Sequence, residues 1–209
     1  TGLANMPADG CMSYDAPGIL IGSTWYNNSG SIEHAGISPG LFLNQGGRVI
    51  RRNNRVFYTS TYGAGYYPLY ISPVYTFAHS IIWASTPTFQ MEVVAVTDNY
   101  VYCSTLNTDA TAPGSIIKFD HDGNYLGVAI AGKGGLTTRA YVVNDSLIYF
   151  AFGNYNNTFI YRWDGVNAPV DTGLRFIGGG TGGNMFRVDA GETLYMVNNN
   201  AGSTTFYAG

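Results

Sequence analysis

The sequence is poor in charge. Only 11% of its 209 residues are charged, the formal net charge is −3, and there is no long run of Lys or Arg. Nucleic acids and anionic membrane surfaces are bound through clustered positive charge, so we expect neither as a partner. No apolar stretch approaches the length of a membrane span, and no signal-peptide pattern opens the chain, so we also expect no membrane insertion.

Side chains that hold metals or act as nucleophiles are equally scarce. The chain has three His and two Cys. His34, His79 and His121 have no Cys or carboxylate at the spacing of a zinc site, and nothing local builds a nucleophilic triad beside them. The glycine-rich run at 178–183 lacks the Lys-Ser/Thr ending of a phosphate loop. We therefore expect no metal, no cofactor and no catalytic residue.

Short runs of β-branched and aromatic residues, separated by polar turns, are what the sequence has in abundance. The clearest example, residues 140–164, reads as three antiparallel strands that we call A, B and C. The B strand recurs at intervals of roughly 37, 44, 47 and 46 residues, which is the spacing of propeller blades. Its five copies are Ile19–Ile21, Val56–Tyr58, Tyr100–Tyr102, Leu147–Tyr149 and Leu194–Met196.

Further strands complete this repeat. We expect C strands at Ser31–Ile32, Leu69–Ile71, Ile116–Phe119, Phe159–Tyr161 and Thr205–Tyr207. Fourth strands, called D, are expected at Leu41–Leu43, Ile81–Trp83, Leu126–Ile130 and Gly173–Phe176. The fifth repeat has no D strand of its own, and Thr1–Leu3 is the candidate to supply it, because an unpaired blade edge is a liability. The sequence predicts one all-β domain over residues 1–209, a five-bladed β-propeller whose N-terminal strand closes the last blade.

The third repeat resembles a known family. Val93–Asp98 (VVAVTD), followed by Ile117–Asn124 (IKFDHDGN), is similar to the blades of NHL and related repeat proteins. The resemblance implies a small propeller of the kind found in lectins, in bacterial surface proteins, and in phage tail and virion modules. It implies a fold much more than an activity.

Two sets of charged residues have both a structural and a functional interpretation. We expect the basic cluster to lie on a solvated hairpin, with phosphate or sialic-acid binding as the alternative; it contains Arg48, Arg51, Arg52 and Arg55. A carboxylate also recurs in the A–B turns, where we expect it to bond its own backbone rather than join a metal ring. These carboxylates are Asp15, Asp98, Asp145 and Asp189.

Two smaller features are interpreted in the same way. Asp120–Asn124 lacks the spacing and the terminal Glu of an EF-hand, so we expect a C–D turn rather than a calcium loop. Cys11 and Cys103 fall on blades that are not neighbours in a ring of five. We therefore expect two buried free thiols and no disulfide.

In a propeller the B–C and D–A loops emerge on one face, here called the loop face, and the A–B and C–D hairpins on the other, the hairpin face. The predicted loop face is rich in Tyr, Asn, Ser and Gly, which build adaptable recognition loops, although the same residues also serve tight turns. A glycan, with its apolar face and rim of hydroxyls, suits such a surface. The candidate binding residues are Trp25, Tyr26, Asn27, Asn28, Tyr62, Tyr66, Asn154, Tyr155, Asn156 and Asn199.

Two functional hypotheses follow. The first is a non-catalytic recognition or assembly module, extracellular or on a virion surface, which binds a glycan in a lectin-like way or a protein partner. The second is a five-bladed glycoside hydrolase, with paired carboxylates in the central funnel. The first is favoured, because the chain has only three Glu and the predicted inner strands carry no carboxylate except Glu92 at the edge of one.

Overall fold

The fold is seen in a computed structural model, which describes residues 12–15, 18–21, 24–27, 29–34, 49–52, 54–59, 69–73, 80–83, 89–107, 114–134, 139–153, 157–177, 185–188, 194–200 and 203–208. All regular elements in these residues are β-strands. Within the same ranges there is no helix of the length and apolarity needed to cross a membrane.

The strands form five antiparallel sheets, and within each sheet they follow one another in chain order. The first sheet contains β1 (Met12–Asp15), β2 (Gly18–Ile21), β3 (Thr24–Asn27) and β4 (Ile32–His34). The second contains β5 (Val49–Arg52), β6 (Arg55–Thr59), β7 (Leu69–Pro73) and β8 (Ser80–Trp83). The third contains β9 (Phe89–Val96), β10 (Tyr100–Asn107), β11 (Gly114–Asp120) and β12 (Tyr125–Gly134).

The last two sheets complete the described part of the chain. The fourth contains β13 (Arg139–Asn144), β14 (Leu147–Gly153), β15 (Asn157–Trp163) and β16 (Val170–Ile177). The fifth has three described strands, β17 (Met185–Val188), β18 (Leu194–Asn200) and β19 (Ser203–Ala208). The proposed closing strand near Thr1–Leu3 lies outside the described residues.

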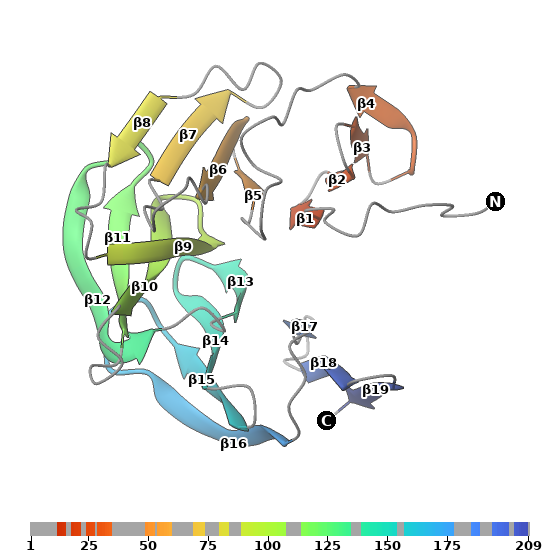
Figure 1. Cartoon of the computed structure of the whole chain (residues 1–209), viewed down its shortest axis with the longest axis vertical. Helices are drawn as coiled ribbons and strands as arrows, with labels where there is room; N and C mark the ends of the chain where they lie inside the picture. Colours follow the sequence, from red (N-terminus) through yellow and green to blue (C-terminus); the bar gives the residue numbers. More distant parts are fainter. Residues whose placement is uncertain are drawn as a thin grey trace.

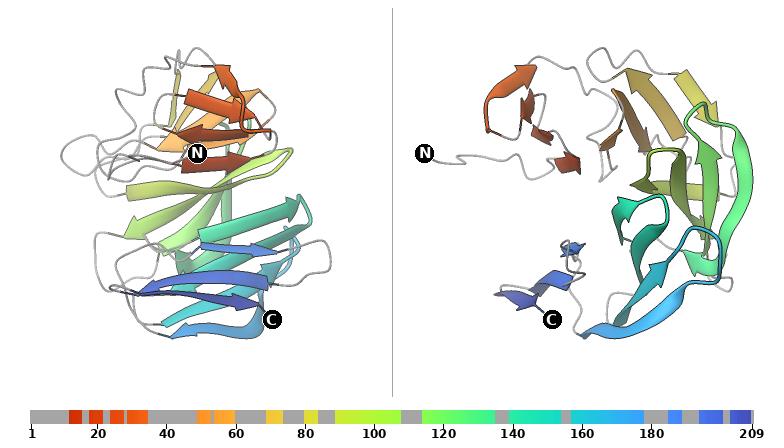
Figure 2. Two further views of the ribbon diagram at one scale, coloured as in Figure 1. Left: turned by 90° about the vertical axis from the view of Figure 1, so that its right-hand side faces the viewer. Right: turned by 180° about the vertical axis from the view of Figure 1, so that it is seen from behind.

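The sheets follow one another around an arc, each with its first strand toward the centre and its last strand toward the outside (Figure 1). The inner strands contact each other in series, β1 with β5, β5 with β9, β9 with β13, and β13 with β17. Seen from the side, the strands run between two opposite faces of the molecule (Figure 2). This radial order is the one that the repeat predicts.

The third sheet is apolar on both of its faces, because it is packed between the second and the fourth. Successive side chains of β10 point to opposite sides, as they do in any strand. Val101 and Cys103 join the cluster shared with the second sheet, which contains Phe57, Leu69, Ile71, Met91, Val93, Val96, Ile117 and Phe119. Tyr102 joins the cluster shared with the fourth sheet, which contains Val94, Ala95, Ile116, Ile130, Ile148, Phe150, Phe152 and Trp163.

Aromatic packing reinforces the second of these interfaces. The rings of Tyr102 and Trp163 meet edge to face with centroids 5.4 Å apart. Such a geometry contributes about 1 kcal/mol beyond the area that it buries. Cys103 is a buried free thiol, as predicted, and its burial raises its pKa. Cys11 lies outside the described residues.

The outer strands of the third and fourth sheets are interrupted by bulges. Gly127 in β12 and Gly173 in β16 have φ angles of 112° and 81°, in the region that favours glycine. The pairing registers of β11 with β12 and of β15 with β16 both shift at these glycines. Bulges twist an edge strand and make it a poor template for another chain.

The first sheet differs from the sequence prediction. Its third strand is Thr24–Asn27, in register with Gly18–Ile21, and Ile32 belongs to the fourth strand rather than the third. The prediction was wrong because it carried the strand spacing of the longer repeats into this one. Gly22-Ser23 is a two-residue connection with Gly first, which is itself a hairpin signal. The expected D strand at Leu41–Leu43 lies outside the described residues.

Gly165, in a turn, and Gly173, in the bulge of β16, should differ in their tolerance of a side chain. Gly165 and Gly173 both have positive φ, but a Cβ on Gly165 would lie 2.8 Å from the backbone oxygen of Asp145, whereas one on Gly173 would meet nothing within 4 Å. We expect Gly173→Ala to cost about 1 kcal/mol through its dihedral alone, and Gly165→Ala to cost clearly more. Urea denaturation of the two variants measures the difference. Equal losses of stability would contradict the close approach of Gly165 to Asp145.

Candidate functional site

Four of the predicted binding residues have a described backbone, and none of them lies in a loop. Trp25, Tyr26 and Asn27 form most of β3, and Asn199 lies in β18, paired with Thr204. Their predicted loop positions were wrong, because an aromatic Thr-Trp-Tyr run favours a strand. Asn28, Tyr62, Tyr66, Asn154, Tyr155 and Asn156 lie outside the described residues.

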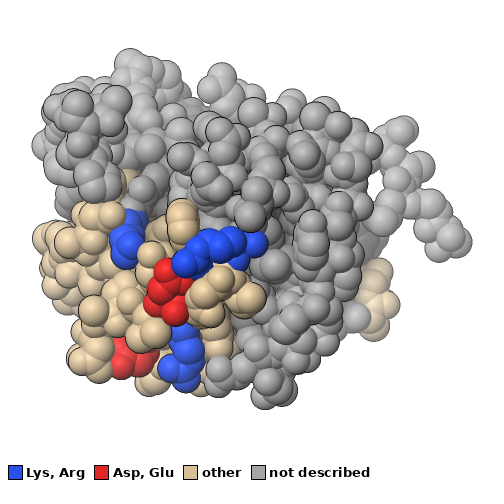
Figure 3. Space-filling view, turned by 90° about the horizontal axis from the view of Figure 1, so that it is seen from below, with Lys and Arg blue, Asp and Glu red and all other residues tan. Residues whose placement is uncertain are grey.

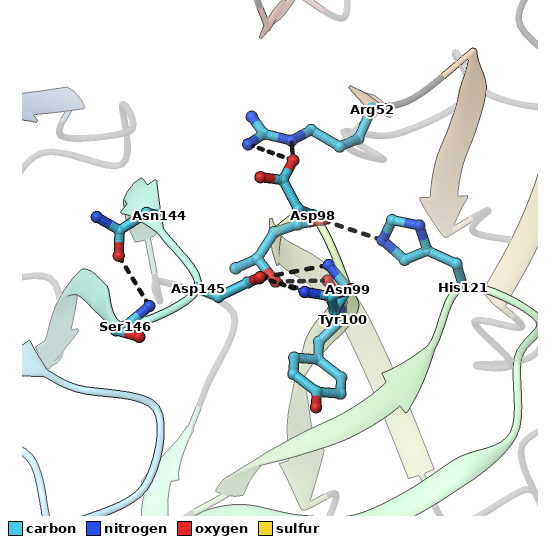
Figure 4. A network of polar contacts seen from close by, with 9 residues as sticks. Arg52, Asp98, Asn99, Tyr100, His121, Asn144, Asp145 and Ser146 are labelled. Carbon is cyan, nitrogen blue, oxygen red and sulfur yellow. Dashed lines mark hydrogen bonds and ion pairs between the residues drawn. The ribbon is translucent and has the colours of Figure 1, made fainter.

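On the hairpin face, an ion pair joins the second sheet to the third. Arg52, at the end of β5, donates from Nε to Asp98 Oδ1 at 2.9 Å, and its Nη2 lies 2.8 Å from the same oxygen (Figure 4). Asp98 stands in the A–B turn of the third sheet. The contact therefore bridges two sheets at the tips of their inner hairpins.

The third and fourth sheets are joined by the equivalent aspartate. Asp145, in the A–B turn of the fourth sheet, accepts hydrogen bonds from the backbone N–H of Asn99 at 3.3 Å and from its side-chain amide (Figure 4). Burial by itself would raise the pKa of Asp145. Hydrogen bonds from the side chains of Thr97 and Asn99 and from nearby backbone N–H groups outweigh that effect, so this pKa lies below its ordinary value.

Both aspartates contact the turn of the preceding sheet, a role that the sequence prediction of local turn capping did not include. Local capping is done by the preceding residue in each turn. Thr97 Oγ1 accepts from the Tyr100 N–H at 3.1 Å, and Asn144 Oδ1 accepts from the Ser146 N–H at 2.8 Å. The side chains of Asp98 and Asp145 instead contact the turn of the preceding sheet. The side chains of Asp15 and Asp189 lie outside the described residues.

The C–D hairpin of the third sheet strengthens its junction with the second. Arg55 Nη1 donates to the backbone oxygen of His121 at 2.5 Å and lies 3.1 Å from Asp122 Oδ1. The His121 ring lies 4.8 Å from that of Phe57, and its Nε2 is 3.0 Å from the oxygen of Thr97. Burial lowers the pKa of His121, and the charges of Arg55 and Arg52 lower it further.

Two members of the basic cluster, Arg52 and Arg55, lie on the predicted hairpin, and their side chains are 24% and 44% exposed. Both are also held in ion pairs that cross from the second sheet to the third. The phosphate or sialic-acid alternative loses support, because two of its four cations already have carboxylate partners. The side chains of Arg48 and Arg51 lie outside the described residues.

The Asp120 segment forms the predicted turn. Asp120 Oδ1 accepts from the N–H groups of Asp122 and Asn124 at 2.9 and 2.8 Å, and Oδ2 from the Asn124 amide at 2.7 Å. Asp164 repeats this pattern with Val166 and Asn167 at 2.9, 2.8 and 2.7 Å. The hydrogen bond from Asn167 contributes most to lowering the pKa of Asp164 to about 2. Within the described residues, no group of three His, Cys, Asp or Glu could hold a metal ion.

A second polar cluster lies on the outer strands of the third and fourth sheets, and we call it the rim cluster. It contains Lys133 of β12, Phe159 and Tyr161 of β15, and Asp171 and Arg175 of β16. Lys133 Nζ donates to the Tyr161 hydroxyl at 3.1 Å and lies 4.2 Å from the ring centre. The Arg175 guanidinium lies 4.5 Å from the centre of the Phe159 ring. Viewed from the β16 side, the described surface shows basic and acidic side chains against one another (Figure 3).

The bulge in β16 creates this cluster. Phe159 pairs with Arg175 and Tyr161 with Asp171, so a step of two residues along β15 matches four along β16. The extra residues bring Asp171 and Arg175 together, and Arg175 Nη1 and Nη2 donate to the two carboxylate oxygens at 2.7 and 2.8 Å. These bonds are the main reason why the pKa of Asp171 is lowered and that of Arg175 is raised.

Sequence reasoning missed the rim cluster as a site. Lys133 lies on β12, beyond the end of the D strand expected at Leu126–Ile130, and Asp171 was not singled out. Phe159, Tyr161 and Arg175 were treated only as strand residues. The available signal was Gly173 inside an otherwise β-rich run, since such a glycine often marks a bulge.

Comparison with known proteins reveals the fold and little else. No protein-family model matches the chain, and no curated protein matches it. TolB from Acinetobacter baumannii is similar in structure, with a TM-score of 0.52 and 13% identity over 99% of this chain and 51% of that one. This chain thus spans about half the length of the TolB chain.

Two peptidases resemble the chain less well. A prolyl endopeptidase has a TM-score of 0.47 at 13% identity, over 90% of this chain and 30% of that one. Prolyl oligopeptidase B from Galerina marginata has a TM-score of 0.46 at 9% identity, over 86% and 26%. The radial sheets and the likeness to TolB show that the chain has a β-propeller-like fold.

The contact of Asp145 with the neighbouring turn should be measurable as stability. We expect Asp145→Asn to lose about 1 kcal/mol at neutral pH, because a carboxylate accepts more strongly than an amide. Asp122→Asn, which breaks an exposed pair on the same face, should cost less than half as much. Urea denaturation of both variants provides the comparison.

The loss at Asp145 should depend on pH. Its folded pKa lies below the ordinary 3.8, so its contribution is complete above that value and disappears as the pH falls through the folded pKa. The stability gap between wild type and Asp145→Asn should therefore narrow between pH 5 and pH 2. A gap that stays constant would mean that the ionised carboxylate is not what joins the sheets.

Proposed function

We propose that this chain is a non-catalytic recognition or assembly module, displayed outside the cell or on a virion, which binds a glycan or a protein partner. The observation that carries the proposal is the structural role of four described aspartates. Asp98 and Asp145 join neighbouring sheets, and Asp120 and Asp164 close hairpins. Each of these carboxylates has a structural role, and that role accounts for its presence without a catalytic function.

Electrostatics favours the same conclusion. A glycosidase needs a general acid that is still protonated near neutral pH, so its pKa must be raised. The pKa values of Asp120, Asp145, Asp164 and Asp171 are all shifted in the opposite direction. The alternative, a five-bladed glycoside hydrolase, would need a carboxylate pair about 5 to 10 Å apart in the funnel. None of the four carboxylates has the environment of its acid.

The recognition surface in this proposal is the loop face together with the adjoining outer strands. Its loops are rich in Tyr, Asn and Gly, including the candidate residues Asn154, Tyr155 and Asn156. The rim cluster lies on the strands β12, β15 and β16. Loops that vary on a rigid scaffold are the usual location of binding residues.

A glycan array probed with the full chain tests this proposal. We expect retention of a subset of glycans by the folded chain and none by the chain unfolded in urea. In parallel, a panel of 4-nitrophenyl glycosides should release no nitrophenolate. Hydrolysis of any of them would favour the glycosidase alternative, and an array without retained glycans would overturn the glycan-binding form of the proposal.

The proposal includes a finer account of the fold, a five-bladed propeller with NHL-like blades whose last blade is closed by residues near Thr1–Leu3. An outer strand at that place would pair with β19 and leave no open edge on the fifth sheet. Deleting residues 1–7 should then lower the free energy of unfolding by several kcal/mol, since a ladder of hydrogen bonds worth about 1 kcal/mol each is lost. The truncated chain should also self-associate. A deletion variant that melts like the full chain and stays monomeric would contradict this closure.

A further inference from the structure

The rim cluster is a rigid arrangement of polar groups at the surface. Asp171 and Arg175 hold each other through two parallel hydrogen bonds, and Asp171 Oδ1 also accepts from the Gly173 N–H at 2.9 Å. The guanidinium makes a cation–π contact with the Phe159 ring, and the Lys133 ammonium makes one with the Tyr161 ring. Groups fixed in this way lose little conformational entropy when a ligand arrives.

In the part of the chain that the structure describes, some hydrogen-bonding groups of the cluster have no partner. A guanidinium has five N–H donors, and within the described residues three of those of Arg175 are used, two on Asp171 and one on the Leu174 oxygen. Lys133 has three donors, of which Tyr161 takes one. Among the described residues, about four cationic donors, the Tyr161 hydroxyl hydrogen and a lone pair of Asp171 Oδ2 therefore have no partner.

The chemistry of these remaining groups is specific. Two cations against one carboxylate leave the cluster with a surplus of positive charge, which suits an anion. Asp171 and the Tyr161 hydroxyl suit neighbouring alcohol groups, one as acceptor and one as donor. Phe159 is 36% exposed and offers an apolar edge to a C–H surface. A ligand that presents a carboxylate, hydroxyls and a C–H face together is an acidic sugar.

We infer that the rim cluster binds an acidic saccharide, with the carboxylate of the sugar on Lys133 and Arg175 and its hydroxyls on Asp171 and Tyr161. The inference rests on the proposed glycan-recognition function and names its ligand class and residues. It also moves acidic-sugar binding away from Arg52 and Arg55, whose charges are committed to Asp98 and Asp122.

The test compares matched acidic and neutral glycans on the full chain. Isothermal titration with 3′-sialyllactose and with a glucuronic acid disaccharide should detect binding, and lactose should bind at least tenfold more weakly. Binding should also weaken as NaCl is raised from 50 to 500 mM, because exposed charges are screened.

Three variants locate the site. Lys133→Gln and Arg175→Gln should each reduce affinity for the acidic glycan about tenfold, the usual effect of removing one charge-assisted hydrogen bond. Arg162→Gln is the matched control, since Arg162 leaves β15 from the face opposite Tyr161, and it should change affinity less than twofold. Thermal melts confirm that each variant is folded. Lys133 and Arg175 stand on different sheets, so a folding defect in one variant leaves the other informative.

Each other outcome has a definite meaning. Equal binding of acidic and neutral glycans would overturn this inference and leave the recognition function standing. A preference for acidic glycans that survives both Lys133→Gln and Arg175→Gln would place the site elsewhere and also overturn it. Retention of no glycan at all would remove the inference together with the glycan-binding function on which it rests.

Discussion

Apolar contact between the faces of neighbouring sheets is the interaction on which the rest of the structure depends. A four-stranded sheet with two apolar faces is not stable alone in water. The third sheet buries both of its faces against the neighbouring sheets. Tyr102 faces one neighbour while Val101 and Cys103 face the other. Because both sides of the strand are buried, its first four residues, Tyr100 to Cys103, form an apolar run rather than an alternation. Every polar feature described above sits at the ends or outer rim of these packed faces.

The polar bridges on the hairpin face determine how the packed sheets are aligned. Hydrophobic attraction is non-directional, whereas a hydrogen-bonded carboxylate requires a defined distance and angle to its donor. Asp98 bonds a guanidinium and Asp145 bonds the backbone amide of a turn. Equivalent residues therefore join neighbouring sheets through different partners. Asp98 and Asp145, two of the four aspartates that recur in the A–B turns, thus belong to the junctions between sheets.

The sequence predicts well what depends on local pattern. The strands of the second to fifth sheets are rich in β-branched and aromatic residues, and Asp120–Asn124 forms the turn that its residues favour. The sequence predicts poorly what depends on contacts between sheets. The partners of Asp98 and Asp145 lie 46 residues away, and no pattern gives the distance between two turns on separate sheets. The rim cluster escaped notice because a bulge, rather than sequence proximity, brings Asp171 to Arg175.

Each aspartate bridge reaches back by one sheet only. The third sheet is bound to the second and to the fourth. In such an array the free energy of unfolding is approximately the sum of a contribution from each repeat and a contribution from each interface between neighbouring repeats. A gene that duplicated or lost one repeat would disturb two junctions and leave the other sheets intact. The repeat number of this architecture is therefore open to change by recombination, provided that the faces newly brought together still match.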